Sequence, residues 1–404
     1  MSEMNERALF ASAIESRARA PWLILLHTGL LNTLFVLPVV MAYYGLKGVG
    51  LGSFFVLQGL FRVSVTVLEI PTGYVSDGWT RRKQLILCTF VRAAGVVVTG
   101  LAIGFWSLAL GEVMAAFATC LWSGTVEAYL YEALEPEQRD RLAAHWQGYL
   151  TASISGSAAV AAVIGPWLFA RHVQAPLLAT LAAVVVALVV VHQLPDVPRK
   201  ERAASARPWH EMLAVARWCL VEHSRLRWLL LGPGSIAGFT LLLFWALQPQ
   251  LSELGASPQE LGWATAGYFV AGTTLAISTG HLTRRLGEKR LFACTLLSVL
   301  LGSALFVWHA NIWTVWLGIL LGGGVVHFTN KPLTIALINH HAPDESRATV
   351  ISVFSMVSTL VGGLYLISAK VLLGVFSYSQ LVLFYLGVTL LLAGKAFWQI
   401  IGAH

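Results

Sequence analysis

Charged residues are scarce in this sequence. Asp, Glu, Lys and Arg make up 12% of the 404 residues, whereas about 25% is usual for a soluble domain. Hydrophobic residues make up 57%, and the mean hydropathy is +0.71. Residues 176–194 carry no charged side chain over a length that would cross the hydrocarbon core of a bilayer once. This composition excludes a soluble globular protein and indicates a polytopic membrane protein.

Signatures of several other protein classes are also missing. The four cysteines are scattered and show neither CxxC spacing nor a disulfide framework. The sequence has no Walker loop, so ATP is not expected as the energy source, and no nucleophile is paired with a base. Residues 339–345 (NHHAPDE) group side chains of metal-ligand type, but adjacent histidines in a short loop are a weak signal for zinc. We therefore predict no enzyme activity, no cofactor and no metal site.

The apolar runs are continuous rather than short and alternating, which favours helices over barrel strands. We predict an all-α fold with twelve transmembrane helices. Their approximate ranges are 20–44, 49–76, 83–105, 107–132, 142–170, 174–194, 228–252, 257–283, 289–310, 312–340, 346–373 and 377–402.

Lys and Arg are distributed unevenly between the two sides of these spans. If both termini are cytoplasmic, 20 of the 27 Lys and Arg lie on the cytoplasmic side, and only Lys47 and Arg171 lie in loops on the other side. This asymmetry predicts a multi-pass protein of the inner membrane with both termini inside. The net charge of +7 then reflects topology, and no nucleic-acid partner is expected. Residues 1–19 contain no apolar stretch, so we expect no cleavable signal peptide.

The spans fall into two groups of six that repeat. GYVSDGWTRRK begins at Gly73 and GHLTRRLGEKR at Gly280, while PEQRDR begins at Pro136 and PDESRA at Pro343, so both motifs recur after 207 residues. Parallel repeats of this kind are an architecture of secondary transporters. The predicted domains are a cytoplasmic N-terminal segment (1–19), a six-helix bundle (20–194), a cytoplasmic linker that could hold an amphipathic surface helix (195–227) and a second six-helix bundle (228–404).

The loop GYVSDGWTRRK resembles the signature between the second and third helices of the major facilitator superfamily, with Gly73, Asp77, Arg81 and Arg82 on the pattern. Trp79 and Thr80 stand where the family usually has a second glycine region. The resemblance implies the major facilitator fold, with two pseudo-symmetric bundles and alternating access, and a cytoplasmic latch formed by this loop. Its cations could also contact anionic lipid headgroups.

A narrower resemblance rests on EIPTG (69–73) and SGTVEAYLYEAL (123–134). Both are similar to sequences of a bacterial branch of drug and metabolite permeases. The arginine motif that proton–drug antiporters often carry in the fourth helix is absent, because the fourth span contains no basic residue.

Ionisable residues inside spans are costly and are functional candidates by default. The second span carries Arg62 and Glu69, and the third carries Arg92. Glu69 is expected either to pair with one of these arginines or to serve as a proton site.

The family resemblance implies that the first, fourth, seventh and tenth spans line a central cavity. Glu127 in the fourth span is the first candidate for proton coupling, on one predicted helical face with Gly124 and Tyr131. Lys331 in the tenth span could face it, bind an anion or extend to the interface, and His327 is a further proton candidate. The other predicted cavity residues are Asn32, Arg62, Arg92, Tyr131, Trp245, Gln248, Asn330 and Lys331.

These observations predict a monomeric secondary transporter that uses the proton gradient to export a small organic amphiphile. One alternative is proton-driven import of a charged metabolite or metal chelate, with Arg62, Arg92 and Lys331 as an anion-binding set. Another is a lipid translocase without a coupled ion.

Overall fold

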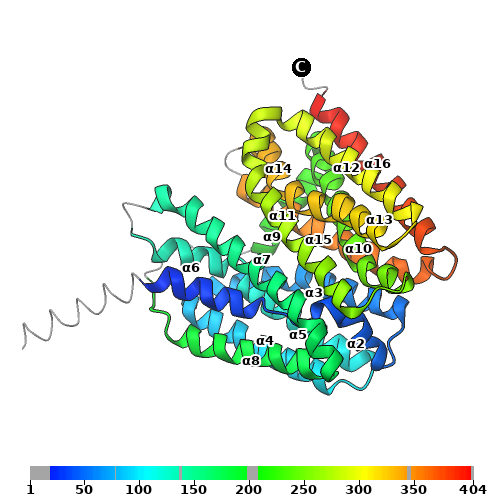
Figure 1. The fold of residues 1–404 in the computed structure, drawn as a ribbon. Helices are drawn as coiled ribbons and strands as arrows, with labels where there is room; N and C mark the ends of the chain where they lie inside the picture. The colour runs from blue at the N-terminus through cyan, green and yellow to red at the C-terminus, as the bar shows by residue number, and fades with distance from the viewer. Residues whose placement is uncertain (1–18, 78, 136–138, 198–207, 344–346, 402–404) are drawn as a thin grey trace, which may run out of the picture.

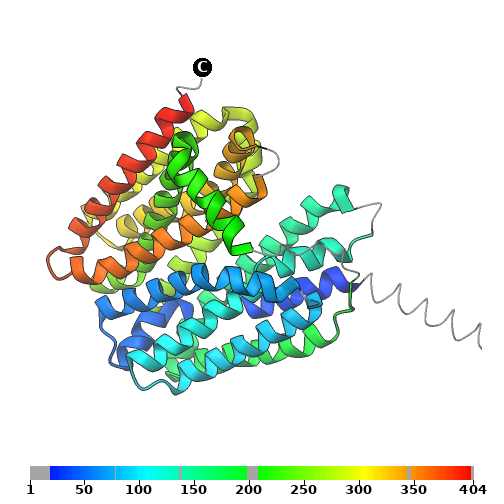
Figure 2. The same cartoon turned by 180° about the vertical axis from the view of Figure 1, so that it is seen from behind.

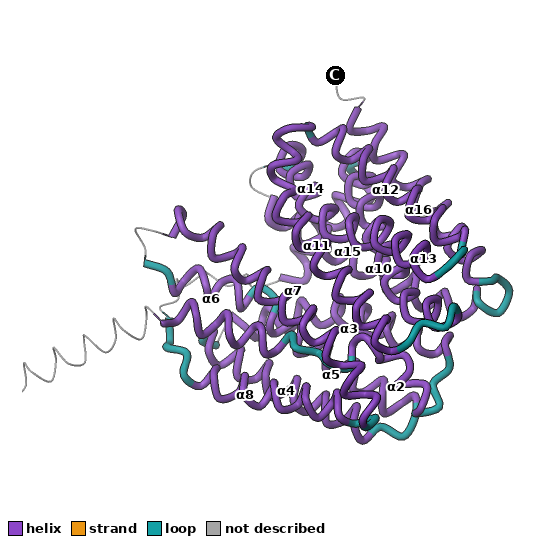
Figure 3. Tube along the Cα trace, in the orientation of Figure 1, coloured by secondary structure: helices purple, strands orange, loops and turns teal. Residues whose placement is uncertain are grey.

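Helices and loops make up the whole of the described structure, a computed structural model (Figure 3). It describes residues 19–401 except 78, 136–138, 198–207 and 344–346, and within some described helices it leaves individual side chains undescribed. Figure 1 shows the helices as two groups that meet at one end.

The N-terminal half contains the first six crossings. They are residues 19–46 with η1 (Leu37–Val39) and α2 (Val40–Leu46), α3 (Leu51–Asp77), α4 (Arg81–Leu101), α5 with α6 (Phe105–Trp122 and Thr125–Ala133), α7 (Arg139–Arg171) and α8 (Ala175–His192).

The C-terminal half follows α9 (Pro208–Arg217) and η2 (Trp218–Glu222), which lie within the predicted linker. Its crossings are α10 (Ser224–Glu253), α11 (Pro258–Leu286), α12 (Glu288–Trp308), α13, η3 and α14 (Ile312–Ile319, Leu320–Val325 and Val326–His341), α15 (Arg347–Leu372) and α16 (Tyr378–Ile401). In the described part of the chain, ten helical segments are long and apolar enough to cross a membrane. The interrupted first crossing and the more polar α11 complete the twelve, so the predicted fold class is confirmed.

The internal repeat extends to the helix boundaries. α3, α4 and α5 begin at residues 51, 81 and 105, and α11, α12 and α13 begin at residues 258, 288 and 312, each 207 residues later. The repeat is therefore a property of the fold as well as of the loops.

Three crossings are interrupted where the sequence predicted continuous helices. The first loses regular structure at residues 32–36, just before Pro38, which has no N–H to continue the helix. There the N–H of Phe35 donates to Thr180 Oγ1 at 3.1 Å. The fourth breaks at Gly124, whose φ is +65°, and the tenth contains the π-helical segment η3. Irregular backbone at membrane depth is tolerated where it lines a cavity or is buried in protein.

The halves close against each other at the end opposite the termini. α3 packs on α15 and α7 packs on α11. A Cβ at Gly59 would lie 2.8 Å from the Gly363 carbonyl oxygen, and one at Gly262 would lie 2.5 Å from that of Ala162, so these helices touch through backbone. Towards the termini the two groups diverge (Figures 1 and 2).

Large apolar side chains cover the outer surface, as contact with lipid requires. Among the tryptophans, Trp22, Trp106 and Trp313 are well exposed near helix ends, which is typical of an interfacial aromatic belt. α10, in contrast, lies in the centre of the main hydrophobic core.

Candidate substrate cavity

A cavity of about 400 Å³ lies between the halves, and we call it the main cavity. The N-terminal half contributes the interrupted first crossing, α3, α4, α5 and α8, and the C-terminal half contributes α10, α11 and α14. Its volume is in the range of small-molecule sites.

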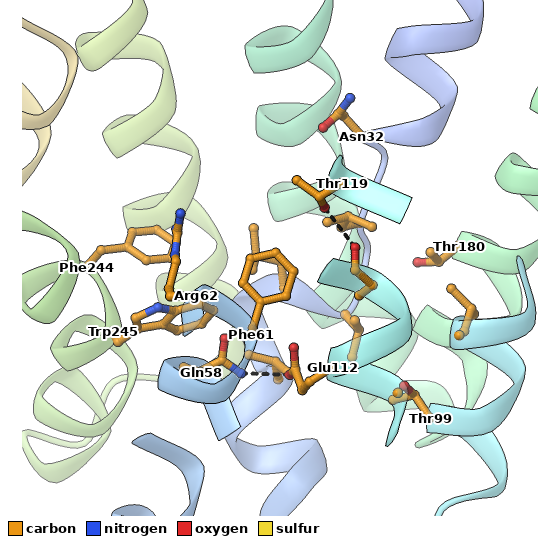
Figure 4. A pocket seen from close by; sticks show the side chains of 18 of the residues that line it. Asn32, Gln58, Phe61, Arg62, Thr99, Glu112, Thr119, Thr180, Phe244 and Trp245 are labelled. Carbon is orange, nitrogen blue, oxygen red and sulfur yellow. Dashed lines mark hydrogen bonds between the residues drawn. The ribbon is translucent and has the colours of Figure 1, made fainter. Parts of the chain in front are cut away.

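Glu112 of α5 lines this cavity and is held by two hydrogen bonds. It is 9% exposed. Tyr44 Oη donates to Glu112 Oε1 at 2.7 Å. Gln58 Nε2 donates to the same oxygen at 2.9 Å, as Figure 4 shows. Within the described part of the chain, Oε2 accepts no hydrogen bond. The carboxylate is thus fixed through one oxygen, and its other oxygen is left for a proton or a ligand.

Two arginines add positive charge to the same wall. Arg62 of α3 and Arg92 of α4 line the cavity and are half-buried. Glu112 acts electrostatically on both, yet in the described structure neither guanidinium has a carboxylate within 4.0 Å. The Arg92 Nε is buried without a hydrogen-bond partner. The lining contributed by the N-terminal half therefore carries two cations, Arg62 and Arg92, and one carboxylate, Glu112.

Aromatic side chains from the C-terminal half also line the cavity, and Figure 4 shows two of them, Phe244 and Trp245, beside Arg62. The ring centroid of Phe244 lies 5.0 Å from that of Trp245 and 5.0 Å from that of Tyr268. Phe269 and Phe328 also line the cavity. This surface suits the apolar body of an amphiphilic molecule.

A second hollow of about 190 Å³, the side chamber, adjoins the main cavity and shares Arg62, Leu241 and His327 with it. Its remaining lining residues are Ala237, Asn330, Lys331, Phe354, Ser355, Ser358 and Thr359.

Comparison with known proteins agrees with this architecture. The family model described as "Major Facilitator Superfamily" matches residues 22–249 and 234–400. The chain belongs to the Major Facilitator Superfamily. It is accordingly a multi-pass secondary transporter and not an enzyme.

The relatives of this superfamily member are distant. The inner membrane transport protein YajR of Escherichia coli (strain K12) is 24% identical over 340 residues, which cover 81% of this chain and 70% of YajR. The nucleoside transporter NupG has a TM-score of 0.75 at 14% identity, with 95% of this chain and 99% of NupG covered. A D-xylose–proton symporter has a TM-score of 0.69 at 14% identity, with 93% and 96% covered. The likeness to these solved structures shows the fold.

The two cavities of this superfamily member include most of the residues that the sequence predicted to line the substrate cavity, together with the predicted proton candidate His327. Asn32, Arg62, Arg92, Trp245 and His327 line the main cavity. Asn330 and Lys331 line the side chamber, together with Arg62 and His327.

Gln248 lies outside both linings and instead connects the halves. Its Oε1 accepts from the Met41 N–H at 3.1 Å, and its Nε2 donates to the Leu37 carbonyl at 2.9 Å. Met41 and Gln248 are 207 residues apart, so equivalent positions of the repeat meet here.

Glu127 and Tyr131 also lie outside both linings. They are exposed on α6, where Glu127 accepts from Gln147 Nε2 at 3.3 Å and the guanidinium of Arg139 lies 5.6 Å from the Tyr131 ring centroid. The predicted single helical face with Gly124 is not found, because Gly124 interrupts the helix.

Glu69 is half-buried on α3 and lines neither cavity. Its predicted ion pair with Arg62 or Arg92 is absent from the described structure. Lys331 on α14, in the other half, acts on it electrostatically. The carboxylate near the two arginines is Glu112 instead.

The predicted latch is described only in part. Arg81 pairs with Glu132 at 3.4 Å. Arg82 donates to the carbonyl of His192 and lies 3.9 Å from Asp196. The surroundings of Gly73 and the side chain of Asp77 lie outside what the structure describes, so the latch stays a prediction.

Sequence reasoning gave no role to Glu112, Gln58 or Tyr44. One available signal was the spacing of Gln58 and Arg62, which lie four residues apart on one face of a span. Two arginines within spans also need a negative charge nearby to offset their cost. Glu112 is a carboxylate within the fourth span, which follows the spans of Arg62 and Arg92.

Proposed function

We propose that this protein transports small organic anions with an apolar body and moves a proton in the same direction. The observation that carries this proposal is the pair of arginines, Arg62 and Arg92, which line the main cavity without a carboxylate within 4.0 Å in the described structure.

A cationic side chain at membrane depth is costly unless it is paired or solvated in a cavity. Guanidinium groups present planar, forked donors that match carboxylate and phosphate geometry. An anionic substrate would supply the missing charge, while its apolar body would lie against Phe244 and Trp245.

Glu112 is the proposed proton carrier. The arginines stabilise its carboxylate from a distance, so an anion bound between them would weaken that stabilisation and favour a proton on the free oxygen. Because linkage is reciprocal, a proton on Glu112 would strengthen anion binding by the same factor. Binding of both together gives symport.

Glu112 replaces Glu127, Glu69 and His327 as the first candidate for coupling. His327 is flanked electrostatically by Arg62 and Lys331, and Coulomb repulsion from two cations opposes a third positive charge there. Of the alternatives drawn from the sequence, the unpaired arginines favour proton-driven import of a charged metabolite over export of an organic amphiphile.

The test is proton flux in sealed liposomes that contain purified protein and an internal pH dye. Aromatic carboxylates and phosphates are offered to the wild type, to Glu112→Gln and to Glu127→Gln, with quaternary ammonium ions of similar size as a comparison. We expect anion-triggered proton uptake in the wild type and in Glu127→Gln, and none in Glu112→Gln. Flux triggered only by the cations, or unchanged flux in Glu112→Gln, would contradict the proposal.

A further inference from the structure

Two polar atoms that line the side chamber have no hydrogen-bond partner among the residues that the structure describes. Asn330 is 2% exposed, and its Oδ1 is buried without a hydrogen bond. The Oγ of Ser358, on α15, is likewise buried without a partner. Both residues line the chamber.

The orientation of the Asn330 amide is fixed by its other end. Its Nδ2 donates to the Pro233 carbonyl oxygen at 2.8 Å. The reverse orientation would place two acceptors against each other, so Oδ1 must be the group without a donor. A buried acceptor that lacks a donor costs free energy until a ligand or water supplies one.

The charges around the chamber limit which donor fits. Arg62 and Lys331 line it, and its described lining includes no carboxylate. An ammonium group would therefore face two cations with no carboxylate in the lining, since Glu69, which interacts with Lys331, lies outside it. Repulsion from the two cations opposes its binding. A neutral hydroxyl or amide N–H meets no such penalty.

We propose that the side chamber binds a neutral hydroxyl or amide group of the transported anion, so that hydroxylated or amidated organic anions are the preferred substrate class. This inference rests on the proposed anion transport. Arg62, which lines both spaces, lies where the charged group would sit. The apolar body then occupies the main cavity, and the donor-bearing group reaches Asn330 and Ser358.

The experiment measures equilibrium binding to the purified full-length protein by calorimetry. The probes are matched pairs that differ in one hydroxyl, such as 3-phenyllactate with 3-phenylpropionate, along with aliphatic and phosphate pairs. We expect the hydroxylated member to bind roughly tenfold more tightly in the wild type, the upper range of one net hydrogen bond. In Ser358→Ala and Asn330→Leu the ratio should fall towards one, while the unhydroxylated anion binds as before. Ser278→Ala, on α11 and outside both linings, is the control.

Ser358→Ala keeps the test valid if Asn330→Leu fails to fold, because Asn330 also holds the Pro233 carbonyl. An unchanged hydroxyl preference in Ser358→Ala would place the recognition of the hydroxyl outside the chamber, and equal binding of both members in the wild type would mean that the chamber holds water only. Either outcome would overturn the inference. If anions of every pair fail to bind, or bind equally to Arg92→Gln, then the proposed function itself has failed.

Discussion

The two halves line the main cavity with different chemistry: the N-terminal half supplies charged residues (the charged wall) and the C-terminal half supplies aromatic residues (the aromatic wall). Shifted by 207 residues, Arg62 corresponds to Phe269, Arg92 to Val299 and Glu112 to Ile319. The described lining from the C-terminal half contains no Asp, Glu, Lys or Arg, whereas that from the N-terminal half contains all three charged residues.

This difference separates the features that build the fold from the side chains that form the site. The helix boundaries keep the repeat, since backbone packing constrains both halves in the same way. The side chains have diverged, so one half supplies charge and the proton site while the other supplies aromatic surface. The predictions below test how strictly the two chemistries are divided.

The largest effect is expected when the charge is moved to the equivalent position of the other half. Val299 is 0% exposed in α12, so Val299→Arg would bury a cation without a partner, at a cost of several kcal/mol. We expect a large loss of monodisperse protein in size-exclusion chromatography and a strongly lowered Tm. The reciprocal Arg92→Val should stay folded but not bind anions. A stable Val299→Arg would show that α12 tolerates a buried charge at the position equivalent to Arg92.

Loss of one cation from the charged wall should have the next largest effect. Arg92→Gln removes a charge that the substrate is proposed to meet, which corresponds to about 2–5 kcal/mol for a buried charged contact. Calorimetry with aromatic carboxylates should then show at least a roughly 30-fold weaker Kd. Arg285→Gln, at the exposed end of α11, should bind normally. Equal losses in the two variants would indicate a general charge effect instead of a site.

On the aromatic wall, Phe244→Ala should weaken anion binding without changing the coupling of anion transport to proton transport. The ring contacts Trp245, Tyr268 and Phe269, and loss of such apolar contact is worth about 1–2 kcal/mol. We expect about tenfold weaker binding of aromatic anions, a smaller change for aliphatic anions and an unchanged number of protons per anion in liposomes. Phe384→Ala, exposed on α16, is the matched control. A changed proton ratio would mean that the aromatic wall also takes part in coupling.

The fold was predictable from the sequence, because apolar runs, basic loops and the 207-residue offset are properties of many residues together. The residues of the candidate site were harder to predict. Arg62 and Arg92 were identified because a charge within a span is conspicuous. Glu112 was passed over since its depth suggested an outer end, and nothing in the sequence shows that Tyr44 and Gln58 converge on it. The break near Pro38 brings Tyr44 into the cavity, and such tertiary contacts between distant segments are not encoded in local spacing.

The smallest effect on anion affinity is expected where equivalent positions of the two halves touch. Gln248 connects the halves at the closed end through two hydrogen bonds, to Met41 and Leu37. Met41 and Gln248 occupy equivalent positions of the 207-residue repeat. Gln248→Ala removes both hydrogen bonds, at about 1 kcal/mol each, so the population with this end open should rise by roughly 10- to 30-fold from a minor level. Spin labels on the 47–50 and 254–257 loops, read by pulsed electron resonance, should show a new longer distance. Because this end is also held by backbone contact at Gly59 and Gly262, affinity for the anion should change only a few-fold. No new distance in Gln248→Ala would place the closing energy in the glycine contacts, and Gly59→Leu, which forces that contact apart, should then produce it.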